Sequence, residues 1–156
     1  MILMVILLIT ACTPQPENVT DTAELAPIYP DYTDITIPSN IAPLNFLLRN
    51  EAEAIQVTLQ GKKENWTIQS DDAHVCFPMK KWHEFLEANQ GGTVAVCLIA
   101  LKEGKWVRYP SFQWTISQDQ IDSYLSYRLI EPAYEVWNEV EIRERNIENF
   151  DEKVLS

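Results

Sequence analysis

Basic residues are scarce in this chain of 156 residues: 12 Lys and Arg stand against 23 Asp and Glu, which gives a formal net charge of −11. Nucleic-acid binding depends on clustered Lys and Arg that replace the counterions of phosphates, and the sequence contains no such cluster. We therefore expect no nucleic-acid partner. We interpret the acidity as a contribution to solubility through mutual repulsion.

Histidine and glycine are also rare, with two and four residues respectively. The sequence contains no G-x-S-x-G nucleophile elbow, no glycine-rich phosphate loop and no H-E-x-x-H zinc motif. His74, Cys76 and His83 are the residues that could suggest a metal or Cys-His site, but no other residue is placed to orient them. We therefore expect no catalytic residue, no metal, no cofactor and no enzyme activity.

No apolar run reaches the roughly 20 residues that a membrane-spanning helix needs. Met1 to Ile9 form a short apolar core, followed by the small residues Thr10 and Ala11 and then by Cys12. This pattern is typical of an export signal that ends in a lipobox-like cleavage site. We predict a signal over residues 1–11, a lipid on Cys12, and attachment to a membrane of the cell envelope, with the outer membrane as the expected location.

The three cysteines reduce to two once Cys12 is assigned to lipid. Cys76 and Cys97 lie in apolar, strand-like contexts, where a bridge would need neighbouring strands with Cα atoms about 5.5 Å apart. Buried free thiols are the favoured interpretation. Between the signal and the first strands, residues 12–26 are rich in Pro, Thr, Glu and Asn, which predicts a flexible tether.

Short strands with frequent turns dominate residues 27–120. Alternating apolar residues predict a hairpin from Ile55 to Ile68 and a strand from Phe112 to Ile116, and the continuous apolar run from Val94 to Leu101 predicts a central strand. One helix is expected from Pro78 to Ala88, since its apolar residues share one face. The chain is thus predicted to be mainly β, an immunoglobulin-like or fibronectin type III-like sandwich with one inserted helix.

Residues 121–156 form an aromatic and acidic C-terminal extension. Val136, Val140 and Ile147 fall on one side of a helix, so we expect the extension to be partly helical and amphipathic. Its apolar side needs either the sandwich or a partner to cover it, and we favour a partner. The residues expected at this docking surface are Tyr124, Tyr127, Tyr134, Trp137 and Phe150.

Aromatic residues also support a competing hypothesis. Trp106 and Tyr109, with Trp66 and Trp114, could form a platform on which sugar rings stack, as β-sandwiches that bind carbohydrate do. Trp66 and Trp114, however, fall in phase with core positions. A carbohydrate-binding module therefore remains an alternative, with Trp106 and Tyr109 as the glycan-facing residues.

The two ends of the domain carry a family resemblance. IYPDYTDITIPSNIAPLNF (28–46), IDSYLSYRLIEPAYEVWNE (121–139) and RERNIENFDE (143–152) resemble the N-terminal region of envelope lipoproteins of the Bacteroides group. In that family the region precedes a haem-attachment-like Cys-x-x-Cys-His segment and a TolB-like β-propeller, and some members are labelled cytochrome c biogenesis proteins. The chain stops before either feature and lacks a basic residue ahead of its signal, so we expect an incomplete gene product.

The resemblance implies a non-catalytic, lipid-anchored module that serves as a spacer or interaction domain for a propeller-type partner or a missing downstream domain. No haem ligand can be carried over to this chain. A fragment of a cytochrome c-related or redox protein is a further alternative, which would require Cys76 or Cys97 to be accessible beside a histidine.

Overall fold

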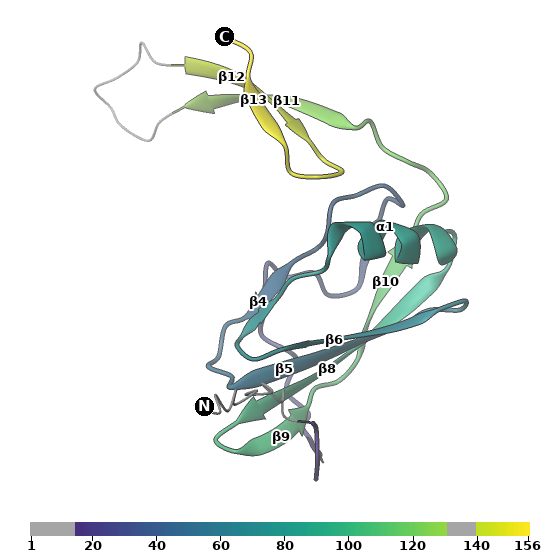
Figure 1. Ribbon diagram of the computed structural model, residues 1–156, viewed down its shortest axis with the longest axis vertical. Coiled ribbons are helices and arrows are strands. Elements are labelled where there is room, and N and C mark those ends of the chain that lie inside the picture. Colours follow the sequence, from purple (N-terminus) through teal and green to yellow (C-terminus); the bar gives the residue numbers. More distant parts are fainter. Residues whose placement is uncertain (1–14, 131–139) are drawn as a thin grey trace, which may run out of the picture.

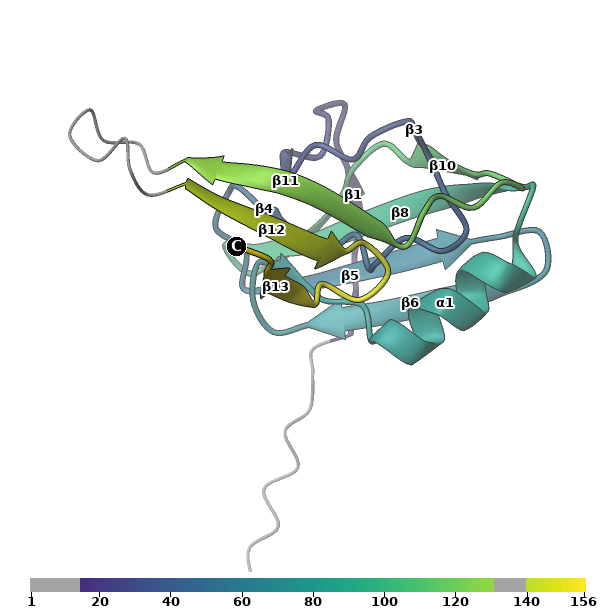
Figure 2. The same cartoon turned by 90° about the horizontal axis from the view of Figure 1, so that it is seen from above.

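The computed structural model describes residues 15–130 and 140–156 of the protein. A two-layered body is followed along the chain by a small C-terminal sheet (Figure 1). Figure 1 shows this sheet at one end of the molecule, beyond helix α1 (Met79–Ala88), and Figure 2, which looks down on that end, shows its strands in front of the body. The sandwich-like body thus precedes the C-terminal sheet along the chain and lies below it in Figure 1.

One large mixed sheet forms the first layer of the body. Its strands are β1 (Thr20–Asp21), β3 (Ile35–Ile37), β5 (Ala54–Gln60), β6 (Asn65–Ser70), β8 (Thr93–Lys102), β9 (Lys105–Arg108) and β10 (Phe112–Ile116). The long central strand β8 pairs with β5 on one edge, and β5 pairs with β6. On its other edge β8 pairs first with β10 and then with β9. β3 and β1 lie parallel to β10 and β9 and complete the sheet.

A smaller sheet and helix α1 form the second layer. The strands of this sheet are β2 (Ile28–Tyr29), β4 (Phe46–Leu48) and β7 (His74–Val75), with β4 in the middle. Pro78 precedes the first turn of the helix, where its fixed φ favours helix entry. The helix turns Trp82, Phe85 and Leu86 inward, as the spacing of its apolar residues dictates.

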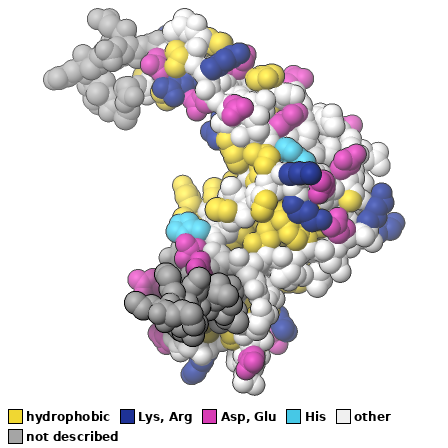
Figure 3. Space-filling view, in the orientation of Figure 1, with side chains coloured by type: hydrophobic (Ala, Val, Ile, Leu, Met, Phe, Trp, Pro, Cys, Tyr) yellow, Lys and Arg dark blue, Asp and Glu magenta, His cyan; other side chains and the backbone are white. Residues whose placement is uncertain are grey.

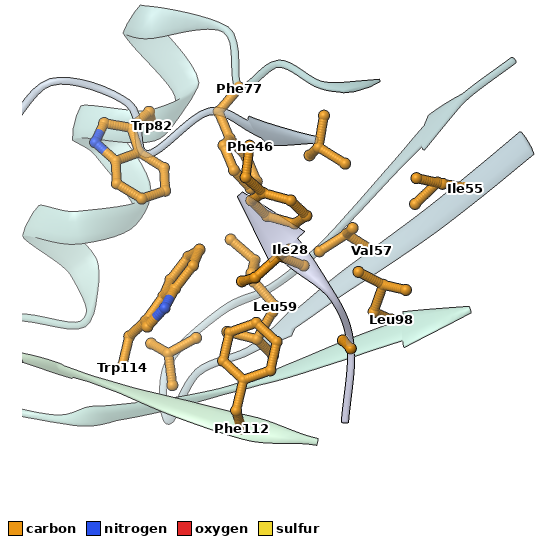
Figure 4. Close-up of a cluster of buried hydrophobic side chains, with 14 of the residues drawn as sticks. Ile28, Phe46, Ile55, Val57, Leu59, Phe77, Trp82, Leu98, Phe112 and Trp114 are labelled. Carbon is orange, nitrogen blue, oxygen red and sulfur yellow. The ribbon is translucent and has the colours of Figure 1, made fainter. Parts of the chain in front are cut away.

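The core lies between these layers and follows directly from the strand alternation. Ile55, Val57 and Leu59 on β5 are at most 1% exposed, whereas Gln56 and Thr58 between them are half-buried on the other face. The centre of the core is aromatic (Figure 4). Further fully buried residues come from the other elements: Val75, Trp82, Phe85, Leu86, Val94, Val96, Leu98, Trp114 and Ile116.

Two tryptophans join the helix to the large sheet. The rings of Trp82 and Trp114 meet edge to face, with centroids 5.8 Å apart, an arrangement that aromatic pairs favour. Each indole N–H donates to a loop carbonyl: Trp82 to Ile41 at 2.8 Å and Trp114 to Tyr32 at 2.7 Å. The buried rings therefore also fix the loops on either side of β3.

The C-terminal sheet is an antiparallel meander of β11 (Tyr124–Ile130), β12 (Val140–Asn146) and β13 (Glu152–Val154). The expectation of a partly helical extension is wrong for these residues. Apolar and charged residues alternate from Val140 to Arg143 at the start of β12, and acids and bases pair between β12 and β13, so the segment gains more from a ladder than from an isolated helix. The helical position assigned to Val136 lies outside the described residues.

The mainly β composition, the hairpin of β5 and β6, the central strand β8, the strand β10 and the helix are confirmed. Within the predicted tether, however, Thr20 and Asp21 pair with Val107 and Arg108, and Ala26 is only 8% exposed. This part of residues 12–26 belongs to the body, because the edge of β9 supplies the hydrogen bonds that composition alone does not reveal.

The two cysteines of the body are both free. Cys97 is half-buried on β8, but Cys76 is exposed, so the expectation of a buried thiol is wrong for Cys76. The reason is strand alternation: Val75 and Phe77 on either side of Cys76 turn into the core.

Replacing Trp82 by Ala should lower the free energy of unfolding by about 3–5 kcal/mol, because it removes a buried ring and leaves a cavity beside Trp114. Chemical denaturation monitored by circular dichroism measures this change. The control is Thr115→Ala, an exposed position on the strand that carries Trp114, for which we expect a change within about 0.5 kcal/mol. Equal effects of the two substitutions would contradict the central role of the tryptophan pair.

Candidate interaction surface

Exposed apolar side chains concentrate in the C-terminal part of the chain. Of the residues predicted for a docking surface, Tyr124 is 58% exposed, Phe150 is 43% exposed and Tyr127 is half-buried. Tyr134 and Trp137 lie outside the described residues. Among the residues that the structure describes, eight of the ten exposed large apolar residues lie from residue 121 onward: Ile121, Tyr124, Leu125, Ile130, Ile142, Phe150, Val154 and Leu155. In the described part of the body, by contrast, only Leu25 and Tyr29 are exposed residues of this kind.

The strand register divides this sheet into two faces. Since Arg128 lies opposite Ile142 and Tyr127 opposite Arg143, alternate residues share a face. The Tyr124 face carries Tyr124, Ser126, Arg128, Ile130, Ile142, Glu144, Lys153 and Leu155. The Tyr127 face carries Leu125, Tyr127, Leu129, Glu141, Arg143, Arg145, Glu152 and Val154. Exposed apolar residues occur on both faces, so neither face is covered by the body.

An ion-pair network organises the Tyr127 face. Arg143 lies between Glu141, at 2.7 Å, and Glu152, at 3.1 Å, and the Tyr127 hydroxyl donates to Glu152. The hydrogen bonds from Tyr127 and Arg143 lower the pKa of Glu152, and the bond to Glu152 raises the pKa of Tyr127. The bonds to Glu141 and Glu152 raise the pKa of Arg143 above its ordinary value. These contacts fix the side chains of the face without covering Leu125 and Val154.

The Tyr124 face has a simpler set of charges. Lys153 pairs with Glu144 at 2.6 Å and lies 5.9 Å from the centre of the Tyr124 ring. The hydrogen bond to Glu144 raises the pKa of Lys153. This end of the face is therefore polar, whereas Ile130, Ile142 and Leu155 expose aliphatic surface at the other end.

Polar contacts attach the C-terminal sheet to the body. The side-chain amide of Asn40 donates to the carbonyl of Ile121 at 2.8 Å and accepts from its N–H at 3.1 Å. The same amide donates to Glu148 at 2.8 Å, and Ser123 donates to Glu148 at 2.9 Å. The backbone N–H of Ala42 adds a bond of 2.8 Å to the carbonyl of Ile147. Hydrogen bonds rather than apolar burial thus hold the sheet in place.

A polar pocket of about 340 Å³ lies at this junction. Its lining residues are Ser39, Asn40, His83, Glu87, Gln90, Gln120 and Glu148. The Nε2 atom of His83 is buried without a hydrogen-bond partner among the described residues, while the hydrogen bonds from Asn40 and then Ser123 lower the pKa of Glu148. The pocket separates the helix from the turn that precedes β13.

The glycan hypothesis is contradicted by the burial of its two key residues. Trp106 is 6% exposed and Tyr109 is 3% exposed, so they offer no platform for a sugar ring. β1 runs beside β9 and covers the edge next to Trp106. Tyr109 lies between β9 and β10, where its N–H bonds to Leu98 and its ring enters the core.

The residues considered for a metal site do not assemble into one. Among residues 15–130 and 140–156, no three His, Cys, Asp or Glu side chains are grouped so that they could hold a metal ion. His74 pairs with Asp72 at 3.2 Å in the turn before β7, and His83 faces the junction pocket. The two histidines therefore lie in separate polar environments, His74 in the turn before β7 and His83 at the junction pocket.

Lowering the pH should loosen the junction. Because the folded-state pKa of Glu148 lies below its ordinary value of 4.5, its contribution is complete above pH 4.5 and is lost as the pH falls through the lowered pKa. Spin labels at exposed positions 115 and 126 would report the distance between body and sheet. We expect its distribution to broaden in acid for the native chain, with a Glu148→Gln variant already broad and independent of pH. A distribution unchanged by both acid and substitution would contradict this account.

Comparison with protein-family models, with curated proteins and with solved structures gives no significant match to this chain. In the part that the structure describes, no helix is both long and apolar enough to cross a membrane. A function has to be argued from the surface of the chain itself.

Proposed function

We propose that the chain is a non-catalytic, lipid-anchored module of the cell envelope that presents its C-terminal sheet to a propeller-type protein partner. In this proposal the body is an immunoglobulin-like or fibronectin type III-like spacer. The lipid on Cys12 holds it at a membrane surface, for which the outer membrane is the expected site. The sheet formed by β11, β12 and β13 is the docking surface.

The concentration of exposed apolar side chains on one small sheet carries the proposal. A soluble monomer rarely leaves such residues together on both faces of a sheet. Figure 3 shows the sheet standing away from the body, with apolar side chains also gathered along the inner side of the bend. A partner that enters this bend would reach one face of the sheet and the neighbouring surface of the body.

The organisation of the sheet also suits a docking role. Internal ion pairs occupy Arg143, Glu152 and Lys153, so a partner need not desolvate these groups as isolated charges. The attachment through Asn40 sets the direction in which the faces point. A sheet oriented before binding loses less conformational freedom when the partner docks.

A photo-crosslinking experiment tests the docking surface. Benzoylphenylalanine at position 142, on the central strand of the sheet, should crosslink to a purified TolB-like propeller protein from the same envelope. The matched control carries the same group at position 115, which is exposed on β10 of the body. Crosslinking at 142 but not at 115 is the expected result. Equal crosslinking at both positions, or none at 142, would exclude the sheet as the docking surface for this class of partner.

Metabolic labelling with a palmitate analogue tests the anchor separately. The native chain should take up the label and sediment with membranes, because one or more acyl chains on Cys12 bind the bilayer. A Cys12→Ser variant should lose the label completely, whereas Cys76→Ser, the control at an exposed thiol, should retain it. Label retained by Cys12→Ser would refute a lipid anchor on Cys12. It would not affect the docking proposal, which the crosslinking experiment tests.

A further inference from the structure

The outer edge of β11 is long and unpaired within the described part of the chain. β11 has seven residues and pairs only with β12 among residues 15–130 and 140–156. It contains no proline and a single charge, on Arg128. Proteins usually protect an exposed edge with proline, several charges or a covering element. An unprotected edge of this length is suited to pairing with another strand.

The sequence of β11 is complementary to itself when it is read in the antiparallel direction. Tyr127 is its central residue, with Leu125 and Leu129 two positions away on either side. An antiparallel pair centred on Tyr127 therefore places each leucine opposite a leucine and tyrosine opposite tyrosine on the Tyr127 face. On the Tyr124 face it places Tyr124 opposite the partner's Ile130, a pair of aromatic and β-branched residues that stabilises antiparallel sheets.

Two neighbouring registers are less favourable. A shift of one residue turns apolar positions toward the wrong face and places Leu125 opposite the partner's Arg128. A shift of two residues in one direction places Arg128 opposite the partner's Arg128, which is repulsive. The centred register avoids both the mismatched faces and the repulsion between arginines. It has two-fold symmetry, so that it closes as a dimer and does not propagate.

Charge also favours this edge over other surfaces of the protein for self-association. Each chain carries a net charge of −11, so two copies repel when acidic surfaces meet. β11 contains no acidic residue, and Tyr124, Leu125 and Ile130 on it are 58%, 55% and 62% exposed. Two copies can therefore meet along β11 without bringing carboxylates of the edge strand together.

We propose that β11 pairs antiparallel with β11 of a second copy of this chain, in the register centred on Tyr127, to form a continuous six-stranded sheet across a two-fold axis. The pairing uses the edge of the sheet and leaves both of its faces open. It therefore goes beyond the docking function proposed above and does not depend on it. A seven-residue edge buries little surface, so the dimer should be weak and concentration-dependent.

Disulfide trapping in the full chain tests the register directly. In the centred register the side chains at position 127 of the two copies face each other, with Cβ atoms about 4.5–5.5 Å apart, close to the geometry that a disulfide needs. In a Cys76→Ser background, Tyr127→Cys should form a covalent dimer under mild oxidation. Leu125→Cys, on the same face, should not, because its two copies would be separated by about 13 Å along the strands.

A mixture provides an independent measurement should the Tyr127→Cys chain fail to fold. Leu125→Cys and Leu129→Cys chains that carry different tags should crosslink to each other when mixed, since these positions lie opposite each other. The Cys76→Ser background alone should form no covalent dimer. The proposal is overturned if position 127 and the 125–129 mixture both fail to crosslink, or if Leu125→Cys alone crosslinks as well as Tyr127→Cys.

This outcome is separable from the docking test. Position 142 lies on the central strand of the sheet and position 127 on its edge strand. Loss of trapping both at 127 and in the 125–129 mixture, with retained crosslinking at 142, would overturn only the dimer, and the reverse result would overturn only the docking surface.

Discussion

The contact between Trp82 and Trp114 is the interaction on which the rest of the structure depends. It joins the helix to the large sheet at the centre of the core, and its two indole N–H groups fix the loops that contain Tyr32 and Ile41. Ile41 follows Asn40, whose amide holds the linker at Ile121 and the turn at Glu148. The direction of the C-terminal sheet is thus set by a chain of contacts that begins in the aromatic core.

The two parts of the protein are stabilised by different forces. The body buries apolar surface on both of its layers, whereas the sheet is attached through hydrogen bonds of Asn40 and Ala42. Each such bond contributes only about 0.5–1.5 kcal/mol, so the attachment of the sheet to the body is weak. The apolar side chains of the sheet stay exposed because the body does not pack against them. This division underlies the proposal that the body is a spacer and the sheet an interaction surface.

Local patterns predicted the body well and the site only in part. Strict alternation from Ile55 to Ile68 fixed a hairpin, and apolar spacing fixed the helix around Trp82. The segment after Val140 mixes charges with few apolar residues, so its apolar pattern does not distinguish a helix from a strand. Pairing with β11, which is not a local signal, makes it a strand. β9, the strand that carries the buried Trp106, pairs with β1, which is distant in sequence. The bond of Asn40 to Glu148 spans 108 positions, and no local signal marks it.

Native-state hydrogen exchange at increasing denaturant tests the central claim most directly, because it measures the opening free energy of each part of the chain. We predict that amides of β5 and β8 exchange only through global unfolding of the body. Amides of β11 and β12 should exchange through a smaller opening, at lower free energy, while the body stays folded. A single opening free energy shared by all four strands would contradict the account, since the C-terminal sheet would then be part of the same cooperative core.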